Sequence, residues 1–153
     1  YERPLESSGT DTSGFLGVQV DATAVYAIYR GPTAADGQVE VLVVKLSRAG
    51  GTPTTIYQRR IDPRATELRL LGVVDGTVLL VRTDSAASDG GTTVTNASLL
   101  ALPSAGGAPR IIADFVRDAP AFGFQTPTFD AEGVYWLTTT GSIYRVPRSL
   151  HRG

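Results

Sequence analysis

Two clusters of residues in this chain have types and spacing that could do chemistry, and the first lies near the C-terminus. Asp130 and Glu132 are two positions apart, directly ahead of Tyr135 and the single tryptophan, Trp136. Paired carboxylates beside aromatic rings are typical of sites that cleave glycosidic bonds, where one carboxyl group acts as the acid. The alternative is that residues 128–138, TFDAEGVYWLT, form a turn followed by a β-strand. The organisation of the whole chain favours this second interpretation.

The second cluster is the charged stretch QRRIDPRATE at residues 58–67. Its arginines would recognise a carboxylate or a phosphate, because a guanidinium group binds such anions through paired hydrogen bonds. The alternative is a solvated loop with local pairing between arginine and aspartate, which contributes little to stability. The candidate binding residues are Arg59, Arg60, Asp62, Arg64 and, in the related stretch 114–123, Arg117 and Asp118.

Other kinds of chemistry lack their usual side chains. Cysteine is absent and His151 is the single histidine, so a thiolate nucleophile and a metal site with several histidines are excluded within this chain. A Ser-His-Asp triad is disfavoured for the same reason. Asp84 and Asp89, in the stretch 83–96, do not have the alternating spacing of a calcium loop. We therefore predict no catalytic residue, no metal site and no cofactor.

Length and charge balance narrow the class of protein. The 153 residues are the length of one ordinary domain, and an apolar fraction of 42% is enough for a core. A net charge of −1 gives no reason to expect a nucleic-acid partner. No apolar run approaches the length of a membrane span. Arginine occurs thirteen times and lysine once, a bias typical of high-GC bacterial genomes.

A repeat of about 55 residues organises the chain. The stretches GVQVDATAVYAIYR, LGVVDGTVLLVR and TPTFDAEGVYWLT each contain an apolar run, an aspartate, a short turn and a second apolar run. Their aspartates, Asp21, Asp75 and Asp130, lie 54 and 55 positions apart, and the Gly-Gly pairs at 50–51 and 106–107 lie 56 positions apart. A constant period in two separate landmarks indicates a repeat architecture.

Each repeat is predicted to consist of four β-strands. The apolar runs are rich in β-branched and aromatic residues and end at Gly, Pro, Asp or Ser, and no stretch has a convincing helical period. Asp75-Gly76 is a two-residue hairpin signal because both residue types tolerate positive φ. The Gly-Gly pairs mark the turn between the third and fourth strands. In the second repeat the predicted strands are Glu67–Val74, Thr77–Thr83, Ala97–Pro103 and Arg110–Phe115.

Repeated four-stranded sheets are the blades of a β-propeller, and several stretches of this chain resemble known blades. VYWLTTTGSIYRVP from Val134, LALPSAGGAP from Leu100 and VKLSRAGGTP from Val44 are similar to the TolB-like and YWTD-like repeats of bacterial propellers. Leu137 and Thr138 depart from the Thr-Asp of a YWTD repeat. The resemblance covers nearly the whole chain and implies an all-β fold, a β-propeller segment of three four-stranded blades.

The segment 1–153 is expected to hold blades at about 15–58, 67–115 and 122–149, with residues 1–14 as a further outer strand. Three blades do not close a ring, because propellers have at least about four. Either the chain is a fragment of a longer propeller, which we favour, or two chains form a six-bladed ring as a homodimer. A monomer of three blades would expose two apolar blade faces.

The resemblance also implies where a ligand would bind. In propellers the loops between blades and the loops between second and third strands share one face, which here would gather 58–67, 114–123, 30–38 and 83–96. The turn at Asp130 would lie on the opposite face. We predict a non-catalytic binding or scaffold module for a protein or peptide, in an extracytoplasmic compartment. The alternative is part of a propeller enzyme, a hydrolase or lyase, whose site needs blades absent from this chain.

Overall fold

Short apolar runs separated by turns form antiparallel β-sheets throughout the described part of the chain. The computed structural model describes residues 14–87, 93–118, 128–130, 132–137 and 143–147. Within these residues, consecutive strands are neighbours in every sheet. The first sheet contains β1 (Gly14–Val20), β2 (Ala24–Thr33), β3 (Val39–Ser47) and β4 (Thr54–Ile61). The second contains β5 (Thr66–Val74), β6 (Thr77–Ala87), β7 (Thr93–Pro103) and β8 (Arg110–Asp118), and the third contains β9 (Thr128–Phe129), β10 (Gly133–Leu137) and β11 (Ile143–Pro147).

The first two sheets repeat the same irregularities of pairing. The register between the first and second strands of each sheet shifts within Phe15–Gly17 and within Leu70–Gly72. The register between the third and fourth strands shifts at Val43–Val44 and at Leu99–Leu100. Because a bulge bends its strand and increases the local twist, equivalent bulges give the two sheets similar curvature.

The predicted turns have the backbone conformations that their residues suggested. Asp75 and Gly76 have φ of 49° and 73°, and the positive signs match the two-residue hairpin predicted there. Gly50 and Gly106, which begin the Gly-Gly pairs, have φ of 90° and 93°. Each pair joins the third strand of its sheet to the fourth, as predicted.

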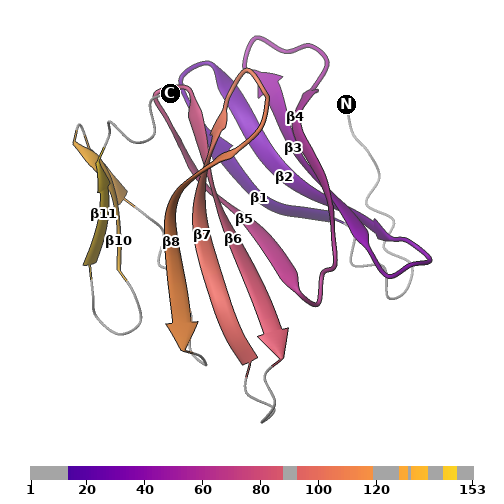
Figure 1. The fold of residues 1–153 in the computed structure, drawn as a ribbon. Coiled ribbons are helices and arrows are strands. Elements are labelled where there is room, and N and C mark those ends of the chain that lie inside the picture. The colour runs from indigo at the N-terminus through magenta and orange to yellow at the C-terminus, as the bar shows by residue number, and fades with distance from the viewer. Residues whose placement is uncertain (1–13, 88–92, 119–127, 131, 138–142, 148–153) are drawn as a thin grey trace.

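The sheets stack face to face in chain order, and Figure 1 shows the second sheet between the first and the third. Side chains alternate between the two faces of a strand. Leu80 of β6 therefore points into a core that it shares with Ile28 of β2. Leu79, the preceding residue of β6, points to the other side, into a core that it shares with Val134 of β10. All four side chains are fully buried. Burial of these apolar faces is the main force that holds the sheets together.

The predicted all-β fold and the four-stranded antiparallel sheets are confirmed for the first two repeats. The third repeat contributes three strands among its described residues. Blade geometry and ring closure stay predictions. The outer strand predicted at 1–14 falls outside the described residues, except for Gly14 at the start of β1. The described elements include no helix with the length and apolarity to cross a membrane.

The strands are longer than predicted, so parts of all four predicted loops are wrong. In the stretch 30–38, residues 30–33 belong to β2. Arg59 and Arg60 belong to β4, and Arg117 and Asp118 belong to β8. In the stretch 83–96, the ends of β6 and β7 continue to pair with each other. The polar composition misled the prediction, because an antiparallel ladder continues regardless of polarity where one face meets solvent.

Candidate functional site

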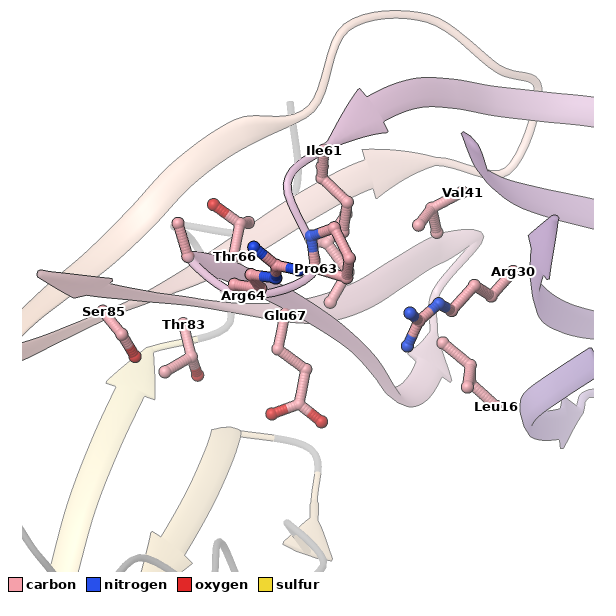
Figure 2. Close-up of a pocket in the computed structure, with 12 residues that line it drawn as sticks. Leu16, Arg30, Val41, Ile61, Pro63, Arg64, Thr66, Glu67, Thr83 and Ser85 are labelled. Carbon is pink, nitrogen blue, oxygen red and sulfur yellow. The ribbon is translucent and has the colours of Figure 1, made fainter. Parts of the chain in front are cut away.

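A pocket of about 280 Å³ lies where β4 leads into β5, at one end of the first two sheets (Figure 2). Its polar lining consists of Arg30, Arg64, Thr66, Glu67, Thr83 and Ser85. Its apolar lining includes Leu16, Val41, Ile61, Pro63 and Leu68. The lining thus combines apolar surface with cationic, carboxylate and hydroxyl groups, a mixture typical of ligand sites.

The connection from β4 to β5 is a tight turn that its own sequence specifies. The amides of Ala65 and Thr66 donate to the carbonyl of Asp62 at 3.1 and 2.8 Å. The amide of Arg64 donates to Asp62 Oδ1 at 2.9 Å. Aspartate followed by Pro63 favours such a turn, because the carboxylate accepts from nearby amides and the proline ring fixes φ. Asp62 is therefore a structural residue that holds Arg64 at the pocket.

The end of β6 is fastened to the same connection. The amide of Ser85 donates to the carbonyl of Ala65 at 2.7 Å, and Thr66 Oγ1 donates to Asp84 Oδ1 at 2.8 Å. Asp84 Oδ2 also lies 2.7 Å from Nε of Arg82. These contacts bring the connection between the sheets and the end of β6 together at one end of the molecule, as the sequence predicted for the loops.

The predicted arginines of this region separate into different environments. Arg60 pairs with Asp36 across 2.9 Å, and both side chains are about half exposed, at 55% and 53%. Such a pair contributes little energy, so the local-pairing alternative describes Arg60. Arg59 is exposed on β4, opposite Val41. Arg64 is the predicted arginine that lines the pocket.

Arg117 and Asp118 are described by their backbone, which lies in β8 opposite Thr95 and Val94 of β7. Their side chains fall outside the described part of the chain. Their role in binding stays a prediction.

Arg30 is a pocket residue that inspection of the sequence missed. It lies in β2, and its Nε is buried without a hydrogen-bond partner among the described residues. Figure 2 shows its guanidinium group directed into the pocket from the side of the first sheet. A buried donor without an acceptor costs free energy, because it has lost its water and gained nothing in exchange. Two signals in the sequence pointed to Arg30: it ends the apolar run VYAIYR, and it begins the stretch 30–38 that the resemblance placed on the ligand-binding face.

The carboxylate pair near the C-terminus forms a turn, as the organisation of the repeat favoured. Asp130 Oδ1 accepts the amides of Glu132 and Gly133 at 2.7 and 3.0 Å. The hydrogen bond from the Glu132 amide outweighs desolvation and, with other donors, holds the pKa of Asp130 below its ordinary value. Glu132 pairs with Arg145 at 3.0 Å. A general acid at neutral pH needs a raised pKa, so Asp130 is unsuited to that role.

Comparison of this chain with protein-family models, with curated proteins and with solved structures gives no match. Among the side chains that the structure describes, no group of three or more His, Cys, Asp or Glu is arranged to hold a metal ion. Function is therefore inferred from the chemistry of the pocket.

Proposed function

We propose that this protein is a non-catalytic binding module of the β-propeller type, which recognises a protein or peptide at the end of the sheets where β4 meets β5. One observation carries the proposal: a pocket of about 280 Å³ lies there, lined by guanidinium, hydroxyl and apolar groups. The apolar groups bury the surface of a ligand, and the polar groups fix its orientation through hydrogen bonds. Recognition of a peptide needs both.

The rigidity of the pocket favours binding. Its walls are strands and a turn closed by the Asp62 carbonyl and carboxylate, and the Ser85 amide ties β6 to that turn. A site that is already ordered loses little conformational entropy when a ligand arrives, which raises its affinity. A flexible loop would lack this advantage.

The propeller part of the proposal rests on the repeat and on the stacking of the sheets. Sheets packed face to face in chain order, with equivalent bulges, are what neighbouring blades of a propeller would require. Further blades, from a longer chain or from a second copy, would complete the ring. Bacterial origin and an extracytoplasmic location belong to the same proposal. The origin is supported by the excess of arginine over lysine, and both are supported by the resemblance of the blades.

An array of synthetic random peptides tests the binding function. We expect the protein to retain a subset of the peptides and Arg64→Ser to lose most of that subset. Arg48→Ser is the matched control, because Arg48 is an exposed arginine in the connection between β3 and β4, at the other end of the first sheet. The proposal fails if no peptide is retained, or if Arg64→Ser retains the same peptides as strongly as the control.

A further inference from the structure

We infer that the pocket between the first two sheets binds a carboxylate group of its ligand, and that the Arg30 guanidinium group is its principal anchor. This inference deepens the proposed function and rests on it, because it names the chemical group that the pocket recognises. The carboxylate comes either from the C-terminus of a peptide chain or from an acidic side chain. Arg30 lies outside the charged stretches 58–67 and 114–123, but it begins the stretch 30–38 that the resemblance placed on the ligand-binding face.

The state of the Arg30 side chain carries the inference. Its Nε is buried and has no acceptor among the described residues, although the guanidinium group belongs to a pocket that has room for a ligand. Arg82, the other arginine with a buried Nε, differs because Asp84 Oδ2 lies 2.7 Å away. Arg30 thus lacks the carboxylate that Arg82 has, and a ligand oxyanion would supply it through charge-assisted hydrogen bonds.

The other charges of the pocket are compatible with an anion. Glu67 is the acidic residue of the described lining, and its Oε1 lies 2.7 Å from Nε of Arg69, so a cation already faces it. Arg64 adds a second positive charge from the turn between the sheets. The hydroxyl groups of Thr83 and Ser85 are further donors along β6.

The size of the pocket indicates how much of a ligand enters it. Its volume of about 280 Å³ is just below the range of roughly 300–1,000 Å³ that holds drug-sized molecules. A pocket of this size accepts the end of a peptide or one side chain, and the rest of the ligand would lie on the surface outside. A carboxylate is the group in such a segment that matches a planar guanidinium geometrically.

The first arm of the test measures stability. Arg30→Met keeps the length of the side chain and removes the unpaired donor, so we expect the melting temperature to stay the same or to rise. A lowered melting temperature of Arg30→Met would show that Arg30 has a structural partner in the protein itself, and the inference would then be overturned. Arg30→Lys, which keeps the charge and loses the planar fork, is a second variant for the binding arm.

The second arm measures binding with small probes by NMR of the arginine Nε–H groups. N-acetylglycine represents a C-terminal carboxylate, the amide of N-acetylglutamate represents an acidic side chain, and N-acetylglycinamide is the uncharged control. We expect one or both carboxylates to shift the Arg30 signal saturably and the control to leave it unchanged. The variants lack the Arg30 signal, so their binding is followed through the Nε–H signal of Arg64, which lines the same pocket. Arg30→Met is expected to weaken binding about ten- to hundredfold, as loss of a charged hydrogen bond does, and Arg30→Lys to weaken it less.

The outcomes of the probe and array experiments separate the two proposals. One outcome is that the array retains peptides whose binding is the same for Arg30→Met as for the unmodified protein, and the same whether the peptide carboxylates are free or amidated. In that case the carboxylate inference is wrong and the binding function stands. If the array retains nothing and N-acetylglycine still shifts Arg30, the peptide-binding function is wrong and the carboxylate site stands. The inference is overturned directly if neither carboxylate probe shifts the Arg30 signal more than N-acetylglycinamide does.

Discussion

The second sheet is covered by described residues on both faces, whereas the first sheet is covered on one. Leu80 faces the first sheet and Leu79 faces the third, and both are fully buried. In the first sheet, Ile28 is fully buried against the second, but Val18 and Val20 on the other face are 54% and 56% exposed. Both sheets nevertheless have almost continuously apolar second strands, which are suited to burial on two faces.

The bulge glycines show that the exposed face of the first sheet corresponds to a buried face of the second. Gly17 pairs with Ile28, and Gly72 pairs with Leu79. The next residue in each second strand, Tyr29 in β2 and Leu80 in β6, points to the opposite face. In the second sheet this is the face that packs against the first sheet, where Leu80 is buried. Its counterpart Tyr29 packs edge to face with the exposed Phe15, at 5.6 Å between ring centroids. The exposed face therefore has the composition of a face that receives another sheet, as the proposed completion of a ring requires.

The largest effect on stability is expected from truncating a side chain in the core between the first two sheets. Leu80→Ala removes a fully buried side chain and should lower the free energy of unfolding by about 3 kcal/mol, because it leaves a cavity. Urea denaturation followed by circular dichroism measures the change. Val18→Ala, on the exposed face, is the control and should change stability by less than about 0.5 kcal/mol. If both substitutions lower the free energy of unfolding equally, the two faces do not differ in burial in solution.

A smaller effect is expected at the turns, where the two sheets use different devices. In the first sheet, Asp21 Oδ1 accepts the amides of Thr23 and Ala24 at 2.6 and 2.7 Å, and Asp21 Oδ2 accepts the hydroxyl of Tyr26 at 3.1 Å. Asp21→Ala should cost about 1–2 kcal/mol of unfolding free energy, because it leaves these donors without their acceptor. In the second sheet, Gly76 has φ of 73°, so Gly76→Ala should cost about 1 kcal/mol. Urea denaturation checks both values, and an Asp21→Ala variant as stable as the unmodified protein contradicts the first.

The turn at Asp21 should also respond to acid. Burial tends to raise the pKa of Asp21, but hydrogen bonds from Thr23, Ala24 and Tyr26 outweigh it and hold that pKa below its ordinary value. The ionised form is thus favoured by folding, so its contribution is present above the ordinary pKa of about 3.9 and is lost as the pH falls through the lowered pKa. Melting temperatures measured from neutral pH downward should fall less steeply for Asp21→Asn than for the unmodified protein. Equal slopes would show that the Asp21 carboxylate has no folded-state advantage.

The smallest effect on stability is expected from substitutions on the exposed face of the first sheet, which should instead reduce association between copies of the protein. Val18→Glu and Val20→Glu place charges among exposed side chains and should change the unfolding free energy by no more than about 0.5 kcal/mol. They should reduce the association that an apolar face promotes. Sedimentation equilibrium should therefore give a mass above that of the monomer for the unmodified protein and a monomer mass for the variants. A monomer mass for the unmodified protein means that the face does not self-associate.

The elements of the fold were predictable from residues close together in the sequence. Asp75-Gly76 and the two Gly-Gly pairs identified turns, because only a few residue types tolerate their backbone conformations. The apolar runs between them identified the strands. The ends of β4, β6 and β8 were not predictable, because polar residues there continue a ladder whose partner is set by the neighbouring strand.

The candidate site was predictable in part. The stretch 58–67 was predicted as a loop that contains Arg64, and the structure has a turn there, closed by Asp62. The Asp62-Pro63 signal for this turn lies within four residues, so it was available in the sequence although it was not used. Arg30 begins a stretch that the resemblance placed on the binding face, but its own role was not predictable, because it depends on a buried Nε without an acceptor among the described residues. The ion partner of Arg60 was not predictable, since Asp36 lies in the connection between β2 and β3, and a role of Arg60 in binding stays a prediction.

The sequence by itself determined that this protein is a repeat of antiparallel strands with defined turns and that Asp130 belongs to such a turn. These features depend on backbone preferences and on the alternation of side chains, which act over a few residues. Only the tertiary structure decided that Arg30 of β2, Arg64 of the connection and Ser85 of β6 line one pocket. Stacking of the first two sheets brings these distant residues together, because the burial of apolar faces, and not any local preference, decides which strand ends meet.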